Sequence, residues 1–381
     1  MLDHLREKID TIDNELLRLF DERMDVVAEV AAYKKTKNLA IKDSKREDEK
    51  LQAIAEKAGD ELAPYAKLLF DKIFELSRSH QYAANQEISD EYKKVQEAIE
   101  NTNKLFPPVA SVACQGVEGA FSQLACNRLF KEPTIQYMKS FEGVFSAIEN
   151  GFCDYGVLPL ENSTAGSVTK IYNLMQSKDF KIVRSVRMKI DHTLAAQKGV
   201  KKEDIKEIFS HEQALSQCAG YLEQNFNKDV KITACENTAI AAEMVATSDR
   251  KDIAAICSNN CIKLYGLNSL ERDIQDRSNN YTRFICISKK LEIYPGADRT
   301  SIMLVLPHTP GSLYKILSRF YTLGINLNKL ESRPMPDRDF EFMFYFDLET
   351  SIYSNEFVKL LDSLHEFCDE FKYLGSYIEV M

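Results

Sequence analysis

The strongest constraint on the fold is a change of pattern near residue 100. The first hundred residues contain a single Gly, Gly59, and a single Pro, Pro64. Since these residue types interrupt helices and no alternating strand pattern is present, this stretch is predicted to be wholly helical. The segment NTNKLFPPVA then breaks the pattern, and short apolar runs alternate with helical stretches beyond it. The chain is therefore predicted to be multidomain, with an all-α part followed by α/β parts.

Three helices are expected in the first part. Apolar residues recur at three- and four-residue steps from Leu5 to Val30, which indicates one long amphipathic helix. A second helix is expected to begin near Ser44, and a third to run from about Leu62 to a polar continuation near Asn101.

Beyond the breaker segment, two further domains are expected. The apolar runs VASVAC, YGVLPL, HTLAA, KITAC, DIAAIC and RFICIS are mostly followed by a loop and a helix, which favours open α/β layers with largely parallel sheets. From about Arg299 the order strand–helix–strand–strand–helix–strand predicts a small ferredoxin-like α+β sandwich. The predicted domains span residues 1–100, 107–290 and 299–381.

Composition excludes several classes of protein. The formal charge is −9, with acidic and basic residues interspersed, so no basic stripe indicates nucleic-acid binding. No stretch approaches the length of apolar sequence that spans a membrane, and the N-terminus lacks the apolar core of a signal peptide. The sequence therefore predicts a cytoplasmic protein without membrane or nucleic-acid partners.

The cysteines and glycines argue against metals and nucleotide cofactors. The nine cysteines are odd in number, scattered through apolar segments, and form no Cys-x-x-Cys pair, which is typical of reduced core thiols. Cys257 and Cys261 lack a nearby His or second pair to complete a metal site. Neither a G-x-G-x-x-G nor a Walker A sequence occurs. We therefore expect neither a metal nor a cofactor.

Basic residues on the first helix are spaced for an anionic ligand. Arg23 and Lys34 are eleven residues apart, about three turns, so they share one face. Arg6 lies seventeen residues before Arg23, which places it roughly 25 Å away along the axis and about 100° round it. A role for Arg6 in a small-molecule site therefore requires a second chain, which implies a dimer with shared sites.

Further polar clusters on the helices have ordinary alternatives. Asp43, Arg46 and Glu47 fall on the opening turn of the second helix, where Ser44 and Glu47 also fit a capping box. Ser77 and Gln81 share a face of the third helix, and on spacing alone a solvated polar stripe is the more common explanation of such a pair. Both interpretations stay open on spacing alone.

A family resemblance favours the ligand-binding interpretation. LREKID, ERMDVVAEVAAYK and IKDSKRE resemble the all-helical chorismate mutases over nearly the whole first 100 residues. The resemblance implies chorismate as substrate and a Claisen rearrangement in which Lys34 and Gln81 donate to the ether oxygen. It places the following residues at ligand-contacting positions: Arg6, Arg23, Lys34, Asp43, Arg46, Glu47, Ser77 and Gln81.

Four motifs of the second domain fall where a strand ends and a helix begins. They are GVEGAFSQLA, PLENSTAGSV, SHEQALSQC and ENTAIAAE. Helix N-termini present free N–H groups, so several that meet at one cleft form an anion site, although each motif alone is also an ordinary helix cap. The segment NYTRF opens a strand and places Thr282 and Arg283 on opposite faces.

These motifs together resemble prephenate dehydratases over residues 107–290. The resemblance implies two α/β lobes, similar in build to periplasmic binding proteins, with prephenate bound between them. It assigns Thr282 to the departing hydroxyl and Arg283 to a substrate carboxylate. Glu212 and Asn237 depart from the family's usual Pro and Ser, and both suit a helix start. The remaining implied substrate-binding residues are Asn162, Ser163, Ser210, His211 and Gln217.

The third domain carries two segments that resemble the ligand motifs of ACT domains attached to prephenate dehydratases. These segments are Gly311-Ser312-Leu313, where Ser312 replaces the usual Ala, and Glu331-Ser332-Arg333-Pro334. A turn and a helix cap are the ordinary alternatives. The resemblance implies feedback inhibition by L-phenylalanine bound between two such domains. The implied effector residues are Gly311, Leu313, Glu331, Ser332 and Arg333.

Two other functions are weighed against a bifunctional enzyme of phenylalanine biosynthesis. Residues 107–290 could form a catalytically silent binding module, since a two-lobed architecture also serves carriers, but the intact YTRF segment argues against it. A mutase fused to a prephenate dehydrogenase would need a nucleotide fingerprint that the sequence lacks. We therefore expect a homodimer or higher homo-oligomer that converts chorismate to prephenate and prephenate to phenylpyruvate.

Overall fold

The computed structural model describes residues 1–37, 39–85, 89–227, 229–335, 338, 341–364 and 367–381. The chain divides into two compact units. One comprises residues 1–93 with 358–367, and the other comprises 94–357 with 368–381. No helix in the described ranges is long and apolar enough to cross a membrane. The predicted domain boundaries near residues 100 and 299 stay predictions.

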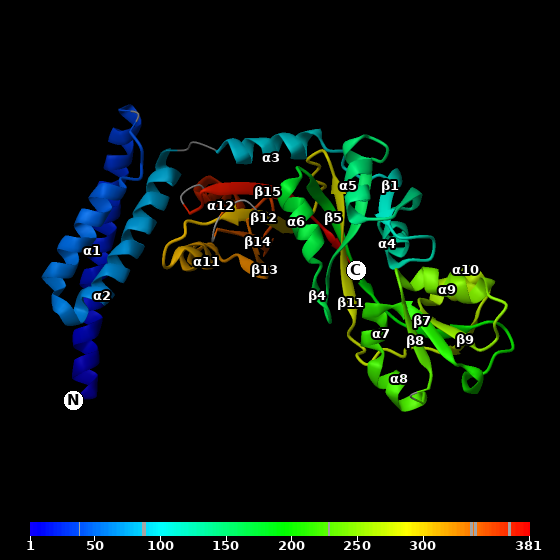
Figure 1. Cartoon of the computed structure of the whole chain (residues 1–381). Helices are drawn as coiled ribbons and strands as arrows, with labels where there is room; N and C mark the ends of the chain where they lie inside the picture. The colour runs from blue at the N-terminus through cyan, green and yellow to red at the C-terminus, as the bar shows by residue number, and fades with distance from the viewer. Residues whose placement is uncertain (38, 86–88, 228, 336–337, 339–340, 365–366) are drawn as a thin grey trace. The chain divides into compact units, whose positions relative to one another are not determined.

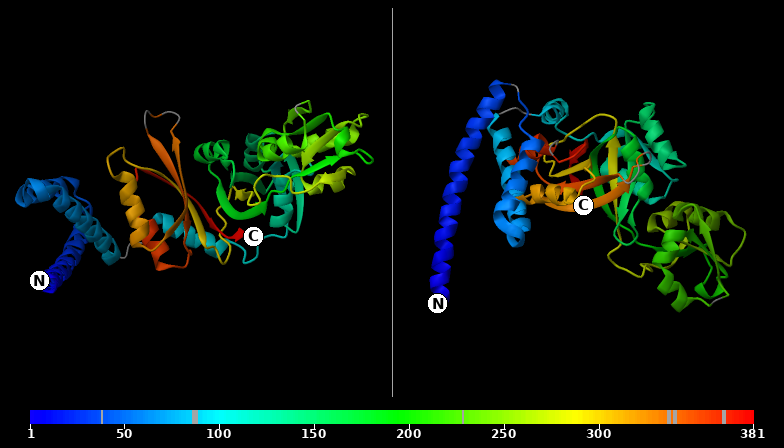
Figure 2. Two further views of the ribbon diagram at one scale, coloured as in Figure 1. Left: turned by 90° about the horizontal axis from the view of Figure 1, so that it is seen from below. Right: turned by 60° about the vertical axis from the view of Figure 1, so that its left-hand side comes forward.

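Long helices form the first unit, as the apolar periodicity predicts. They are α1 (Leu2–Thr36) and α2 (Ser44–Asn85), and α2 is two helices joined at Gly59, whose φ of 73° is not helical. The continuation toward Asn101 is a separate helix, α3 (Asp90–Asn101), so the prediction of one uninterrupted third helix was wrong. The first turns of α1 extend past the bend where the two helices of α2 meet (Figures 1 and 2).

A seven-stranded sheet forms the larger layer of the second unit, in the order β16-β5-β11-β3-β1-β2 with β4 paired to β3. Strand β1 is parallel to β2 and β3, whereas β11 is antiparallel to both β3 and β5. The prediction of largely parallel sheets was therefore wrong in part. The strands are β1 (Val109–Gln115), β2 (Glu132–Met138), β3 (Tyr155–Asn162), β4 (Gly166–Ser167), β5 (Lys181–Lys189), β11 (Tyr281–Ser288) and β16 (Glu379–Val380).

A five-stranded sheet follows, in the order β10-β6-β9-β7-β8, and is also mixed. Its strands are β6 (Thr193–Ala196), β7 (Glu207–His211), β8 (Lys231–Cys235), β9 (Ile253–Cys257) and β10 (Asn268–Glu271). The helices between strands of these two sheets are α4 (Phe121–Leu129), α5 (Phe141–Glu149), α6 (Thr169–Ser177), α7 (Glu212–Gln217), α8 (Ala219–Asn225), α9 (Thr238–Thr247) and α10 (Asn259–Tyr265).

The last segment follows the predicted element order. In chain order it contains β12 (Arg299–Val305), α11 (Ser312–Thr322), β13 (Asn326–Pro334), β14 (Phe342–Glu349), α12 (Asn355–Ser363) and β15 (Glu370–Tyr377). Its four strands form an antiparallel sheet in the order β13-β14-β12-β15. The closing sequence GSYIEVM does not form a single strand. It ends β15 and supplies β16, which pairs with β5 of the seven-stranded sheet.

One apolar core joins the seven-stranded and four-stranded sheets. It contains Leu158, Ile182 and Ile285 from the first sheet and Met303 and Tyr345 from the second. Strand β15 comes so close to β5 that a Cβ at Gly375 would lie 2.2 Å from the carbonyl oxygen of Ile182. Only glycine fits there, and its φ of +140° is also unfavourable for other residues. The four-stranded sheet is thus packed against the strands that carry Asn162 and Thr282.

Candidate functional sites

A cavity of about 500 Å³ in the helical unit is lined by charged side chains of α1 and α2. Six cationic and two anionic side chains line it, which makes it a site for an anion. Seven of the eight predicted mutase residues are among the lining residues: Arg23, Lys34, Asp43, Arg46, Glu47, Ser77 and Gln81. The other cationic residues are Lys50, Lys57 and Arg78.

Contacts between the helices hold these side chains in place. The Arg23 guanidinium donates to Ser77 Oγ, and burial lowers the pKa of Arg23. Arg78, which the sequence analysis missed, lies 2.5 Å from the Glu47 carboxylate. Arg78 lies three residues before Gln81 on the same helix, and this spacing is the sequence signal that could have identified it as a cavity residue. Gln81 Oε1 is buried and has no hydrogen-bond partner among the described residues.

Both interpretations of the opening turn of α2 describe part of the structure. Asp43 Oδ1 accepts a hydrogen bond from the Arg46 backbone N–H at 3.1 Å, which is a capping contact. Asp43, Arg46 and Glu47 also line the cavity. The Lys34 ammonium donates to the Ile41 carbonyl, so it ties α1 to the segment that leads into α2.

Arg6 lies apart from this cavity, as its helical offset predicts. Its guanidinium is exposed and lies 3.5 Å from Asp3. Its neighbours Leu5, Ile9 and Ile12 are 50%, 56% and 58% exposed. The first turns of α1 thus present an apolar stripe to solvent in the single chain.

A second cavity, of about 440 Å³, is lined by residues from both the seven-stranded and the five-stranded sheet regions. Four predicted dehydratase residues line it: Asn162, His211, Gln217 and Thr282. Ser163 and Ser210 do not: Ser163 Oγ donates to the Asn279 carbonyl, and the buried Ser210 Oγ donates to the Ile256 carbonyl. These two hydroxyls are engaged by neighbouring loops and strands.

Helix starts surround the second cavity, as the four motifs predict. Helix α4 begins without a side-chain cap, and Gly116, Phe121 and Ser122 around its start line the cavity. Asn237 caps α9 by accepting from the N–H groups of Ala239 and Ile240. No Lys or Arg occurs among the described lining residues, so positive potential there comes from backbone N–H groups.

His192 and Asn280 belong to this site and were missed by the sequence analysis. His192 lines the cavity, and its Nε2 lies 2.8 Å from Gln217 Oε1. Asn280 contacts Gln217 at 2.9 Å and Asn162 at 2.8 Å. Burial lowers the pKa of both His192 and His211. A lone His before a strand carries no distinctive pattern, whereas Asn280 stands two residues before Thr282 and could have been found with it.

Arg283 lies on the other face of its strand, so the predicted contact with a substrate carboxylate is corrected. It does not line the cavity. Its guanidinium is ion-paired to Asp347, donates to Tyr377 Oη at 2.6 Å, and lies 3.3 Å from Glu161. Burial alone would lower the pKa of Arg283, but Tyr377 and Asp347 raise it. The strand alternation that exposes Thr282 to the cavity directs Arg283 toward the four-stranded sheet.

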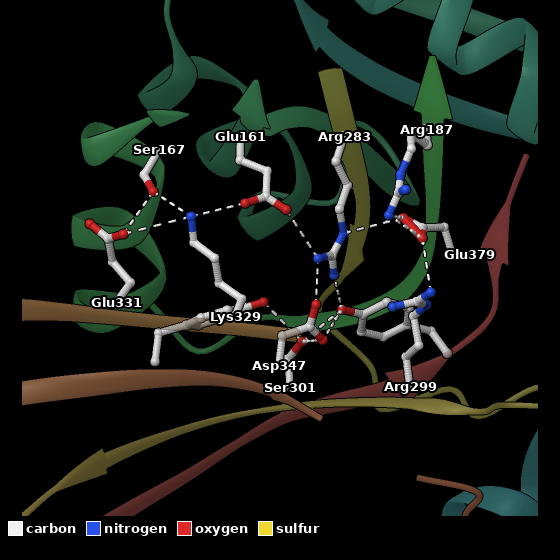
Figure 3. A network of polar contacts seen from close by, with 12 residues as sticks. Glu161, Ser167, Arg187, Arg283, Arg299, Ser301, Lys329, Glu331, Asp347 and Glu379 are labelled. Carbon is white, nitrogen blue, oxygen red and sulfur yellow. Dashed lines mark hydrogen bonds and ion pairs between the residues drawn. The ribbon is translucent and has the colours of Figure 1, made fainter. Parts of the chain in front are cut away.

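Figure 3 shows the buried ion-pair network around Arg283. Lys329 Nζ lies 2.9 Å from Glu161 Oε2 and 2.7 Å from Ser167 Oγ. Burial would raise the pKa of Glu161, but Lys329 and Arg283 lower it. At the other end, Glu379 lies 3.0 Å from Arg187 and 3.1 Å from Arg299. Cations and carboxylates therefore alternate across the boundary between the two sheets.

A third cavity, of about 510 Å³, lies beside the start of α11. Gly311 and Leu313 line it, as expected for an effector site, but Glu331, Ser332 and Arg333 do not. The Glu331 carboxylate accepts from Ser167 Oγ at 2.7 Å, and Arg333 lies 3.5 Å from Glu331. Ser332 is paired across the sheet with Phe344, which does line the cavity, so its side chain lies on the same face.

No cluster of His, Cys, Asp and Glu that could hold a metal occurs in the part of the chain that the structure describes. Cys257 and Cys261 are both buried and free.

Comparison with known proteins identifies two families. A family model described as chorismate mutase type II matches residues 5–82, and one described as prephenate dehydratase matches residues 112–292. The chain is 32% identical to the bifunctional chorismate mutase/prephenate dehydratase of Aquifex aeolicus (strain VF5), over 99% of this chain and 97% of that protein. It is 31% identical to the Escherichia coli (strain K12) protein of the same name, over 98% and 95%.

A solved structure is similar to a large part of this chain. The prephenate dehydratase of Arthrobacter aurescens, in complex with L-Phe, aligns with a TM-score of 0.64 and 28% identity. The alignment covers 70% of this chain and 89% of that one.

Proposed function

We propose, starting from the fact that this chain belongs to the family of bifunctional chorismate mutase/prephenate dehydratases, that its helical cavity is the mutase site and its second cavity the dehydratase site. The observation that carries both assignments is the arrangement of the predicted residues. Seven of eight mutase residues line the first cavity, and Asn162, Gln217 and Thr282 are hydrogen-bonded around the second.

In the mutase site the chain acts by holding and neutralising its substrate. Chorismate carries two carboxylates, and its Claisen rearrangement breaks one C–O bond and forms one C–C bond without a nucleophile or proton transfer. Arg23 and Arg46 suit bidentate contacts to carboxylates. Lys34 and Gln81 are assigned to the ether oxygen, where negative charge develops as the C–O bond breaks.

A second copy of the chain is proposed to complete the mutase site. Arg6 stands outside the cavity of its own chain, and Leu5, Ile9 and Ile12 beside it are exposed. An apolar stripe on a helix is normally covered, and a second copy would cover it while it brings Arg6 to the partner's cavity. Mixed dimers of inactive Arg6→Ala and Arg46→Ala chains should then recover mutase activity. Mixed dimers that stay inactive would place Arg6 outside the partner's site.

In the dehydratase site the ring of prephenate is made aromatic. The bond to the ring carboxylate breaks and releases carbon dioxide. Its electron pair enters the ring and expels the hydroxyl, which takes a proton and leaves as water. Thr282 is assigned to the departing hydroxyl, and helix starts such as that of α4 are assigned to the carboxylates.

The two assignments are tested by single substitutions in separate cavities. Arg46→Ala should remove mutase activity and retain phenylpyruvate formation from supplied prephenate, and Thr282→Ala should do the reverse. If either folded variant lost both activities, the assignment of two separate sites would be wrong. A wild-type chain that bound prephenate without forming phenylpyruvate would favour the alternative of a silent binding module.

Residues 299–381 are proposed to be an ACT domain that binds L-phenylalanine and inhibits the dehydratase. The supporting observations are the cavity at Gly311 and Leu313 and the L-Phe bound to the Arthrobacter aurescens enzyme. Ser332→Ala should weaken inhibition while uninhibited turnover stays close to wild type. Tyrosine serves as the control effector. A dehydratase rate unchanged by millimolar phenylalanine would remove this assignment.

The setting of the enzyme is proposed to be the cytoplasm, because all nine cysteines are free.

A further inference from the structure

The side-chain amide of Asn162 has one defined orientation. Its Oδ1 accepts hydrogen bonds from the backbone N–H groups of Thr164 and Ala165, both at 2.9 Å. A backbone N–H can only donate, so the oxygen must face the turn and the NH₂ group must face the other way. The loop after β3 therefore fixes the direction of every further bond that this amide makes.

The orientation of Asn162 determines what Thr282 can do. Asn162 Nδ2 donates to Thr282 Oγ1 at 2.9 Å. The Thr282 oxygen thus accepts from the protein, and its hydroxyl proton has no acceptor among the described residues. Thr282 is 9% exposed and lines the second cavity. Its proton is therefore available to a group in that cavity, and the bond it accepts polarises the hydroxyl toward donation.

The hydrogen bonds continue, with their donors and acceptors fixed in turn, from Asn162 through the amides of Asn280 and Gln217 to His192. Asn162 Nδ2 also donates to Asn280 Oδ1 at 2.8 Å, so Asn280 Nδ2 donates to Gln217 Oε1 at 2.9 Å. Gln217 Oε1 can only accept, so His192 Nε2 must carry a proton and donate to it at 2.8 Å. His192 is 2% exposed, and its Nδ1 has no partner among the described residues.

We propose that Asn280 and His192 are positioning residues of the dehydratase reaction, which hold the Gln217 amide and the NH₂ group of Asn162 in place so that the Thr282 hydroxyl donates into the cavity. The proposal rests on the proposed role of Thr282 and adds to it a direction and two residues. Neither new residue needs to touch the reacting atoms. Without these two residues, the Gln217 amide could rotate and the Asn162 NH₂ group would lose its second acceptor, so its bond to Thr282 Oγ1 would be held less firmly.

Asn162→Asp tests the direction of the network. The substitution preserves the oxygen that accepts from Thr164 and Ala165 but replaces the donor to Thr282 with an acceptor. Thr282 should then donate to the new carboxylate, and dehydratase kcat should fall about 100-fold or more at neutral pH. Protonation of that carboxyl restores a donor, so kcat should recover as pH falls.

The control is Asn237→Asp, which adds the same charge to the same cavity and keeps the cap of α9 but does not contact Thr282. It should show no recovery of kcat in acid. The other titratable groups that line the cavity are His192, His211 and Glu236, and Glu161 and Arg283 lie behind the strands. The pH profiles of kcat for the wild type and Asn237→Asp show the effect of all these other groups. A recovery in acid that is seen only in Asn162→Asp therefore comes from its new carboxyl. A flat or falling Asn162→Asp profile toward low pH would overturn the proposed direction.

A second pair of variants tests His192. His192→Gln keeps an N–H donor near the position of Nε2, whereas His192→Leu removes it. We expect kcat to fall about tenfold or more in His192→Leu, with KM changed less, and to be largely restored in His192→Gln. Thermal unfolding of each variant checks that the unit is folded. Equal kcat in the two folded variants would overturn the role of His192, and an unchanged kcat in Asn280→Ala would overturn that of Asn280.

Thr282 variants separate failure of this inference from failure of the proposed function. Thr282→Val keeps the shape and removes the hydroxyl, and Thr282→Ser keeps the hydroxyl. If Thr282→Val retained activity, the assigned role of Thr282 would be wrong, and the inference would fall with it. If Thr282→Val were inactive but Asn162→Asp showed no acid recovery, only the inference would be wrong.

Discussion

The two candidate active sites offer positive potential to an anion by different means. The mutase cavity is lined by six cationic side chains, whereas no Lys or Arg is found among the described residues that line the dehydratase cavity. Long helices offer a ligand their sides, so positive charge must come from side chains. The α/β layers place helix starts at strand ends, so backbone N–H groups can take that role. Fold class thus determines whether charge or backbone dipoles hold the anion.

Charge is present near the dehydratase site, but it lies behind the strands. On β3 and β11, Asn162 and Thr282 are paired in register and face the cavity, while their neighbours Glu161 and Arg283 are paired and face the four-stranded sheet. The neutral network and the ion-pair network are therefore one residue apart along the same two strands. Cations there pair with buried carboxylates, whereas in the helical unit they line the cavity.

The largest expected effect comes from breaking the network behind the dehydratase site. Asp347→Ala leaves the 5% exposed Arg283 without its main partner, which should cost about 3–5 kcal/mol in the free energy of unfolding. Calorimetry should show a lower Tm for the second unit and an unchanged transition for the helical unit. Arg338→Gln, which removes exposed ion pairs with Glu341 and Glu370, is the matched control. Equal Tm values in the two variants would show that the buried pair adds no stability.

Removing one cation from the mutase cavity should have the next largest effect. Lys34→Met deletes the donor assigned to the ether oxygen, so mutase kcat should fall about 10²–10³-fold. Dehydratase activity in the same chain should not change. Lys67→Met on the exposed surface of α2 is the control. A loss below threefold would mean that Lys34 does not stabilise the transition state.

Ionic strength should change the KM values of the two sites by different and smaller factors. Raising ionic strength screens charge attraction, so KM for chorismate should rise several-fold between about 0.05 and 0.5 M salt. KM for prephenate should rise less, because short backbone N–H contacts inside a cavity are screened less than exposed cations. Assays with sodium chloride and potassium chloride would exclude an effect of one specific ion. If KM rose equally with salt concentration for both substrates, the two sites would not differ in how they attract an anion.

The smallest effect concerns pH. Burial lowers the pKa of His192 and His211, so the folded state favours the neutral imidazoles. The resulting stability is fully present above the unfolded-state pKa of about 6.5 and is lost as pH falls toward the lowered folded-state pKa values. Denaturant titrations of the second unit between about pH 7.5 and 5 should show the decline. His192→Gln should make it shallower, and an identical slope would assign the decline to other groups.

Local patterns in the sequence predicted which side chains gather at the cavity of the helical unit. The spacing of Arg23 and Lys34 on a straight helix fixes their common face, and the same arithmetic correctly removed Arg6 from that face. The break at Gly59 agrees with the prediction of one helix from Ser44 and another from about Leu62. The separation of α3 from α2 was not predicted, because no Gly or Pro stands between Asn85 and Asp90.

The dehydratase site was less accessible to sequence reasoning because its partners are distant in the chain. Asp347 lies 64 residues from Arg283, and no local spacing connects them. The alternation of YTRF did predict that Thr282 and Arg283 face opposite ways, which already conflicted with substrate contacts for both. Apolar runs show where strands form, but they do not show which strands pair or in which direction. The antiparallel direction of β11 and the pairing of β16 with β5 were therefore not predictable from them.

The shared Arg283 network has a consequence for recombination between family members. Exchange of residues 299–381 for the equivalent segment of a relative would take the carboxylate that meets Arg283, the phenol of Tyr377 and the Glu379 strand of the seven-stranded sheet from a different parent than Arg283 itself. The segment is therefore a poor unit for grafting, even though its own sheet is complete. Crossovers that keep Glu161, Arg283, Lys329 and Asp347 from one parent should give more soluble chimeras than crossovers placed in the loop between residues 290 and 299.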